Sequence, residues 1–127
     1  MLVRRMIHVL DAPDLHVESS FWAQLLDGTV DDTESDWHSV IVDGEWRLGV
    51  QLAPDHVPPV WPGGGQQQQV HLDLWVDDFA RAHDRAMSLG ATLLKAADDP
   101  ATKGEIFQVY ADPAGHPFCL CRAPLTD

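Results

Sequence analysis

The chain carries the same order of segments twice. The first copy pairs a strand-like segment at residues 4–11 with a helical one at 15–27, and the second pairs 70–76 with 79–89. A repeat of this length indicates one supersecondary unit that is used twice and shares one core. A duplicated unit also places equivalent strands around a common cleft, and so predicts which residues meet there.

Each helical segment is followed by three strand-like segments. Those after the first helix are 28–31, 37–42 and 46–52, and those after the second are 91–96, 105–111 and 116–122. Asp14 and Asp78 stand where helix N-caps are expected, and Gly90 stands where a helix ends. Asp43 and Gly44 suit a tight hairpin turn, because both central residues of a type I′ turn have positive φ. The sequence therefore predicts an α+β fold of two βαβββ modules.

The length of 127 residues suits one domain, 1–127, with a real core. We expect module one at 1–53 and module two at 70–127. Residues 54–69 contain four prolines and three glycines, which rules out regular structure and makes this segment a linker. It could equally be a lid, because Trp61 has apolar area to place somewhere.

Composition excludes several partners. A formal net charge of −12 argues against nucleic acid, whose phosphates require clustered basic residues. The apolar runs are too short to span a bilayer, and the first residues do not resemble a signal peptide. Cys119 and Cys121 are better read as free thiols than as a disulfide, because i and i+2 positions of one strand are at the edge of disulfide reach. We therefore expect a cytoplasmic protein.

Strand alternation sorts residues onto two faces of each expected strand. The set expected to pack under a helix is Trp46, Leu48, Val50 and Leu52 in module one, and Leu72, Leu74 and Val76 in module two. If the sheet curls, the opposite faces line its concave side. The expected cleft residues are Arg47, Gln51, His71, Asp73, Trp75 and Cys119. The remaining histidines, His16, His38, His56 and His83, have no partner pattern and are expected at the surface.

Five sequence fragments together carry a resemblance to a known family. They are FWAQLLDG, RLGVQLAPDH, PPVWP, HLDLWVDD and DPAGHPFCLCR, in this order. With the paired modules, they resemble the vicinal oxygen chelate (VOC) superfamily, which holds glyoxalases, bleomycin resistance proteins and extradiol dioxygenases, and most nearly its small glyoxalase-like domain proteins. The resemblance implies a curled mixed sheet around a cleft, and it favours a homodimer.

The resemblance also implies where metal ligands would lie. His71, Gln51 and Cys119 match three of the family's ligand positions, and the fourth depends on the register of the first strand. Aligning Asp14 with Asp78 brings Ile7 opposite His71, whereas a shift of one residue would bring His8 into the cleft. Neither set contains a carboxylate, so no metal is expected. If a divalent metal does bind, at His71, Cys119, Gln51 and His8, the thiolate favours zinc.

The sequence leaves three function classes open. The first is a metal-free protein that binds a small organic ligand, of the resistance or sequestration kind. The second is a lyase, isomerase or dioxygenase, either metal-dependent or with His71 as base and Arg47 or Gln51 stabilising an oxyanion. A protein-interaction module is a third alternative. His71 and Gln51 could also be structural hydrogen-bonding residues, and Cys119 a buried apolar one.

Overall fold

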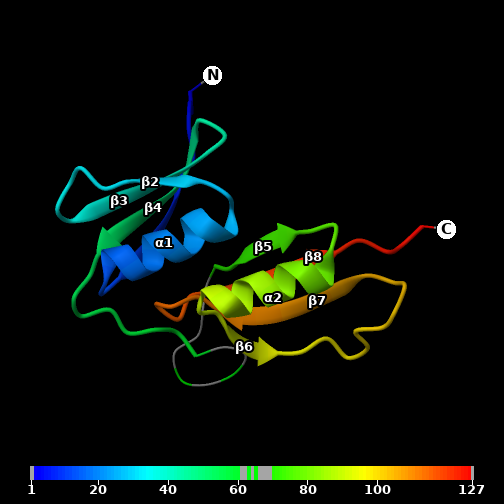
Figure 1. Cartoon of the computed structure of the whole chain (residues 1–127). Helices are drawn as coiled ribbons and strands as arrows, with labels where there is room; N and C mark the ends of the chain where they lie inside the picture. Colours follow the sequence, from blue (N-terminus) through cyan, green and yellow to red (C-terminus); the bar gives the residue numbers. More distant parts are fainter. Residues whose placement is uncertain (1, 61–62, 64, 66–69, 127) are drawn as a thin grey trace. The chain divides into compact units, whose positions relative to one another are not determined.

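The computed structural model describes residues 2–60, 63, 65 and 70–126 (Figure 1). Its elements are β1 (His8–Ala12), α1 (Leu15–Leu25), β2 (Thr29–Asp31), β3 (Trp37–Val42), β4 (Glu45–Leu52), β5 (Leu72–Trp75), α2 (Phe79–Leu89), β6 (Thr92–Lys95), β7 (Ile106–Ala111) and β8 (Pro117–Arg122). This is the predicted βαβββ order, twice, and it confirms the α+β fold. The chain forms two compact units, Met1–Val57 and Pro58–Asp127, whose boundary falls inside the segment predicted as linker. The division into modules at 53 and 70 stays a prediction.

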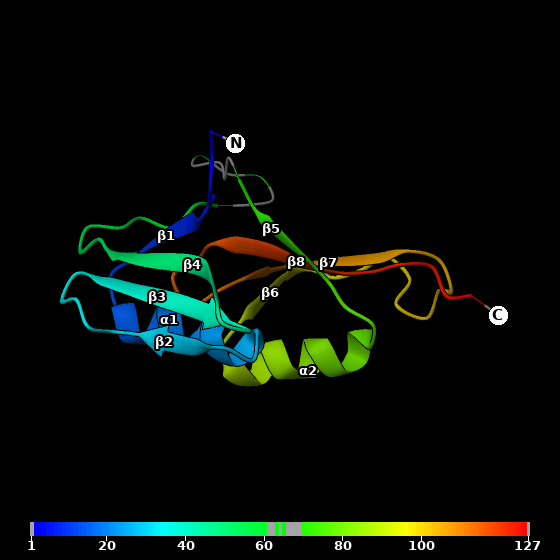
Figure 2. The ribbon, with the colours of Figure 1, turned by 90° about the horizontal axis from the view of Figure 1, so that it is seen from above.

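The first unit is a four-stranded mixed sheet with α1 against one face (Figure 2). The strand order is β1-β4-β3-β2, with β1 parallel to β4 and the other neighbours antiparallel. Its core is apolar, and Trp22, Phe21, Val40 and Val50 are almost fully buried. The β3–β4 hairpin turns at Asp43 and Gly44 with φ of 52° and 75°, as predicted from these two residues.

Both helices begin at the predicted caps. The Asp14 carboxylate accepts a hydrogen bond from the Val17 amide, and the Asp78 carboxylate accepts one from the Arg81 amide, both at 3.1 Å. The α1 helix is shorter than predicted, because Asp27 takes a positive φ of 56° and turns the chain out of the helix. The α2 helix ends at Gly90 in the left-handed conformation, as expected for glycine.

A β-bulge in β4 corrects the predicted face of Trp46. Ile41 pairs with Trp46, but the next residue, Val40, pairs with Leu48, so Arg47 is an extra residue in β4. One extra residue reverses the alternation beyond it. Trp46 therefore lies on the face opposite Leu48, away from α1, and the prediction that it packs under the helix is wrong.

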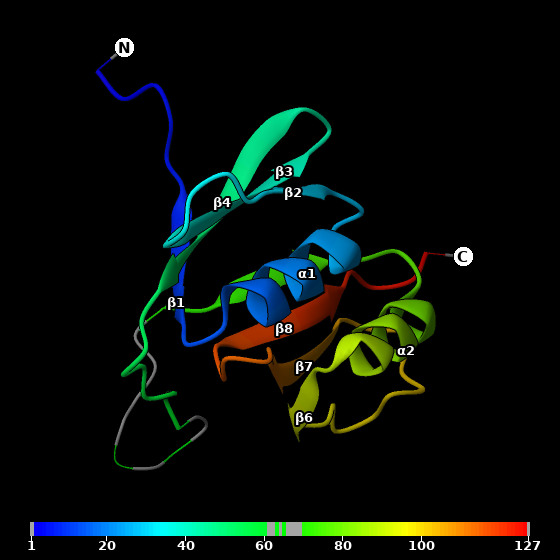
Figure 3. The ribbon, with the colours of Figure 1, turned by 60° about the vertical axis from the view of Figure 1, so that its left-hand side comes forward.

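The second unit repeats this arrangement, with strand order β5-β8-β7-β6 and α2 packed against β8 (Figure 1). Figure 3 shows β8, β7 and β6 side by side. Here β5 runs parallel to β8, and the other neighbours are antiparallel. The core centres on Phe118, which stacks on the fully buried Tyr110 with 5.3 Å between ring centroids. Among the described residues, no helix is both long and apolar enough to cross a membrane.

Two histidines predicted at the surface take part in interior hydrogen bonds instead. His38 is 3% exposed, and its Nδ1 lies 2.8 Å from the Ser19 hydroxyl on α1. His83 is half-buried, with Nδ1 2.7 Å from the Tyr110 hydroxyl. Both partners come from other elements of the same unit, which sequence alternation does not reveal.

Candidate functional site

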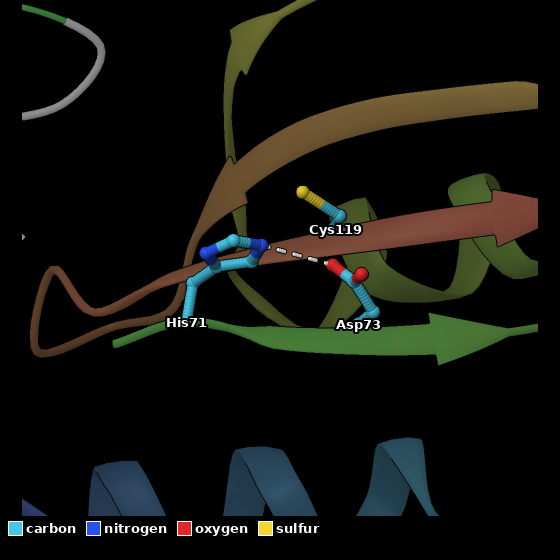
Figure 4. Close-up of side chains that lie close together, drawn as sticks. All are labelled: His71, Asp73 and Cys119. Carbon is cyan, nitrogen blue, oxygen red and sulfur yellow. Dashed lines mark ion pairs between the residues drawn. The ribbon is translucent and has the colours of Figure 1, made fainter. Parts of the chain in front are cut away.

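The second unit brings His71, Asp73 and Cys119 together. His71 immediately precedes β5, Asp73 lies two positions on, and the parallel β5–β8 pairing sets Asp73 directly beside Cys119. The three side chains point toward one another from these two strands (Figure 4). His71 Nε2 lies 3.1 Å from Asp73 Oδ1, and one donor atom from each of the three residues lies within 4.8 Å of the others.

The Cys119 thiol of this group and the neighbouring Cys121 thiol both hold their protons at neutral pH. Burial raises the pKa of Cys119 to about 12, and the Asp73 carboxylate and the neighbouring Cys121 act in the same direction. Burial also raises the pKa of Cys121 to about 11, with Asp73 and Glu105 adding to it. At neutral pH Cys119 is therefore a neutral thiol beside an imidazole and a carboxylate.

Aromatic side chains flank the group on the same face of the sheet. Cys121 pairs with Trp75 on one side and with Phe107 on the other. Trp75 is 59% exposed and Phe107 56% exposed, whereas Cys119 is only 4% exposed. This face of the second unit thus combines three convergent polar groups with large apolar surface, which is the composition of a small-molecule site.

The predicted cleft residues of the first unit, Arg47 and Gln51, both lie on β4. Arg47 is exposed at the bulge and pairs with Glu45 at 3.3 Å. Gln51 is exposed and pairs in register with Asp11 of β1 and Trp37 of β3. The predicted lid residue Trp61 lies outside the described residues.

The register of β1 bears on the two alternatives predicted for the first strand, in which either Ile7 or His8 faces the cleft. His8 pairs with Leu48, so it shares the α1-facing side with Leu10 and Ala12. Gln51 shares the opposite face, with Val9 and Asp11. In the first unit His8 and Gln51 therefore point to different sides of the sheet, as in the register that places Ile7 rather than His8 opposite His71.

Two features of the structure were not predicted from the sequence: the role of Asp73 as a possible metal donor, and the position of Trp37 over Gly49. Asp73 was expected in the cleft, but not as a metal donor, although its position two residues after His71 on one strand face was the available signal. Trp37 was not singled out at all. The signal for it was Gly49, because a glycine inside a strand often marks a close approach of another group. A Cβ atom on Gly49 would collide with the Trp37 indole ring.

The His71–Asp73–Cys119 group can hold a divalent metal. Imidazole nitrogen, thiolate sulfur and one carboxylate oxygen form a donor set that suits zinc, and three protein ligands is the number that catalytic zinc sites have. Manganese prefers oxygen-rich sites, and a thiolate is a soft donor, so the set fits zinc better than manganese.

The fold and its paired modules are similar to those of solved structures described as fosfomycin resistance proteins and as glyoxalase/bleomycin resistance protein/dioxygenase proteins. The fosfomycin resistance protein FosX from Listeria monocytogenes is similar with a TM-score of 0.70 and 14% identity, over 97% of this chain and 95% of that one. A glyoxalase/bleomycin resistance protein/dioxygenase family enzyme from Burkholderia phytofirmans has a TM-score of 0.68 and 16% identity, over 92% and 96%.

A second structure of the Listeria protein, complexed with Mn(II) and a sulfate ion, has a TM-score of 0.67 and 14% identity, over 96% of this chain and 92% of that one. No curated protein matches the chain. The glyoxalase-like domain family matches residues 8–121. The chain therefore belongs to the glyoxalase-like domain family, which confirms the resemblance read from the five fragments.

Proposed function

We propose that this protein binds a small organic ligand without a full metal site, in the manner of a resistance or sequestration protein. The observation that carries the proposal is the convergence of His71, Asp73 and Cys119 beside the exposed rings of Trp75 and Phe107. The polar groups would orient the ligand, and the aromatic surface would supply apolar contact. Arg47, Gln51 and Trp61 stay candidates for further ligand contacts.

Similar structures suggest the first probes. Neighbours of this fold include proteins named for fosfomycin resistance and for bleomycin resistance. Fosfomycin and bleomycin are therefore the compounds to screen first by calorimetry and thermal shift, followed by a library of small aromatic acids and amines. A ligand at 100 times its Kd raises the free energy of unfolding by about 2.7 kcal/mol, which a thermal shift detects readily.

His71→Gln tests the site itself. An amide can replace one hydrogen bond of the imidazole, so the fold should persist while binding of any ligand found in the screen falls at least tenfold. His56→Gln is the matched control, because it makes the same change in the first unit. If His71→Gln binds as tightly as the wild type, His71 is a structural residue and the proposed site is wrong.

A metal-dependent lyase, isomerase or dioxygenase is the second candidate, and one observation favours it: the three donor atoms lie within 4.8 Å of one another. Bound zinc would supply Lewis-acid chemistry. His71 and Asp73 would hold it by imidazole and carboxylate, and Cys119 would give up its thiol proton to do so.

Elemental analysis of protein purified without chelator separates the two candidates. The metal-free proposal expects less than about 0.1 zinc per chain, with no change on Asp73→Asn. One zinc per chain that is lost in Asp73→Asn and in Cys119→Ser would overturn the metal-free proposal and favour the metal-dependent candidate. Asp77→Asn is the control, since Asp77 follows β5 and is not among the three donors.

We infer further that the protein works in the cytoplasm. Both cysteines are free and buried, which fits a reducing compartment.

A further inference from the structure

Two tryptophans form an aromatic corner on the face of the first sheet that points away from α1. His38 marks the face of the sheet that α1 covers, because its ring lies within hydrogen-bond distance of the Ser19 hydroxyl on α1. Trp37 precedes His38 by one residue in β3 and therefore lies on the opposite face. The bulge at Arg47 turns Trp46 to the same side as Trp37. The two rings meet edge to face, with centroids 6.2 Å apart and planes at 80°.

Both indole rings are held in place by hydrogen bonds from their N–H groups to neighbouring protein atoms. Trp37 Nε1 donates a hydrogen bond to the Ser39 hydroxyl at 2.9 Å, and Trp46 Nε1 donates one to the Leu48 carbonyl at 2.8 Å. Trp37 also lies over Gly49, where any side chain would displace it. What the rings offer a ligand is therefore their faces, and an indole face is electrostatically negative.

The hollow beside this corner is acidic. Asp31, Thr33, Glu34, Trp37, Ser39 and Trp46 line it. The adjoining loop reads DDTESD from Asp31 to Asp36, with four carboxylates in six residues, all of them exposed. The Asp31 carboxylate accepts hydrogen bonds from the Thr33 amide and hydroxyl, at 3.1 and 2.9 Å, and so fixes the start of this loop.

The chain already places one cation on this corner. The Arg5 guanidinium carbon lies 5.4 Å from the centroid of the Trp46 ring. Trp46 also lines a second hollow, which contains Arg4, Arg5 and Arg47. Trp46 thus lines both an arginine-rich hollow and an acidic one, and a guanidinium cation already lies over its ring.

We propose that the Trp37–Trp46 hollow binds a small organic cation of the quaternary ammonium class, with its charge against the indole faces and the carboxylates of Asp31 and Glu34. Cation–π attraction is strongest for tryptophan, and the two carboxylates add to it. The inference goes beyond the proposed function, because this hollow lies wholly within the first unit and uses none of His71, Asp73 and Cys119.

Choline and its neutral isostere 3,3-dimethyl-1-butanol form the direct test. The chain has five tryptophans, and each gives one indole N–H signal in a ¹H–¹⁵N spectrum of the labelled protein. We expect choline to shift the signals of Trp37 and Trp46 saturably in the millimolar range, and the isostere to shift them at least fivefold more weakly. Equal binding of the two compounds would overturn the proposal, as would choline shifts confined to Trp22, Trp61 or Trp75.

Four variants at exposed positions refine the test, because none of them changes the core. Glu34→Gln removes a carboxylate from the hollow and should weaken choline binding about two- to fivefold, whereas Asp98→Asn in the second unit should not. Arg5→Ala removes the cation already on Trp46 and should tighten choline binding by a similar factor. Arg4→Ala makes the same charge change without the ring contact, and should leave binding unchanged.

The two pairs of variants also have a result that would contradict the proposal. Equal effects of Glu34→Gln and Asp98→Asn, or of Arg5→Ala and Arg4→Ala, would show that only net charge matters, and would overturn the proposed hollow. His71→Gln should leave choline binding unchanged, so a failure here is distinct from a failure of the proposed ligand site in the second unit.

Discussion

Cys119 shows at the scale of one residue how burial, together with a neighbouring carboxylate, controls the reactivity of a thiol. The reactive species of a cysteine is the thiolate, and a pKa of about 12 leaves about one thiolate in a thousand at pH 9. We expect iodoacetamide to alkylate the folded protein at pH 8 at least a hundredfold more slowly than it alkylates the urea-unfolded chain. The measurement is the modified mass over time, and Asp73→Asn should speed the reaction, because it removes a negative charge beside Cys119.

The pKa shift also sets a pH window for stability. The folded-state pKa of Cys119 lies above its ordinary value of 9.0, so the folded state holds the thiol proton more tightly than the unfolded state. The stabilisation is complete below pH 9 and is lost as pH rises toward 12. We expect the free energy of unfolding, measured in urea, to fall over this window, and to fall less in Cys119→Ala. Equal slopes in the two proteins would contradict this prediction.

Single residues were predictable where the signal is local. The alternation of His71 and Asp73 along one strand is visible in the sequence, and so is the cap at Asp78. The pairing of Asp73 with Cys119 joins residues far apart in the chain, and periodicity carries no information about it. For the same reason the Ser19–His38 bond could not be foreseen, since it depends on which strand α1 covers.

At the scale of elements, the bulge in β4 is the clearest case of what periodicity misses. Residues 48–52 of β4 alternate as expected, but the extra Arg47 moves Trp46 to the other face. The helix starts were predicted correctly because cap chemistry needs only neighbouring residues. A bulge depends on the partner strand, and its position is therefore set by tertiary pairing.

Gly49→Ala tests whether the position of the Trp37 ring in the aromatic corner requires the absence of a side chain at Gly49. A methyl group at Gly49 would collide with the Trp37 ring, and overpacking of this kind costs about 1–3 kcal/mol in the free energy of unfolding. We expect that loss in urea unfolding, together with shifted indole signals of Trp37 and Trp46. Gly65→Ala is the control, because nothing lies within 4 Å of its Cβ position. Equal stability of both variants would show that Trp37 does not need the glycine.

The equivalent helix caps offer a paired test at the same scale. Asp14 and Asp78 each accept a hydrogen bond from an amide three positions on. Asp14→Ala and Asp78→Ala should each lower the free energy of unfolding by about 1 kcal/mol, while the exposed Asp55→Ala should change it by less than about 0.5 kcal/mol. Circular dichroism in urea measures both. No loss in either cap variant would mean that solvent replaces the cap.

At the scale of the whole molecule, the fold could be predicted from the repeat, because the order of strand-like and helical segments in each βαβββ module is visible in the sequence. The association of chains does not follow in this way. Each four-stranded sheet ends in two edge strands, β1 and β2 in the first unit and β5 and β6 in the second. An edge strand exposes unpaired backbone groups, and proteins pair or cover such edges. This physical argument, and the family resemblance, favour a homodimer.

The strand β6 is the edge that we expect in the dimer. Its residues are all exposed, and Leu93 and Leu94 present apolar side chains at 36% and 39% exposure. Light scattering at high micromolar concentration should give twice the chain mass of 14.1 kDa. Leu94→Lys should shift the mass toward the monomer, because a charged edge residue opposes pairing. Leu125→Lys adds the same charge outside any strand and should leave the dimer intact, whereas a monomeric wild-type protein would contradict the prediction outright.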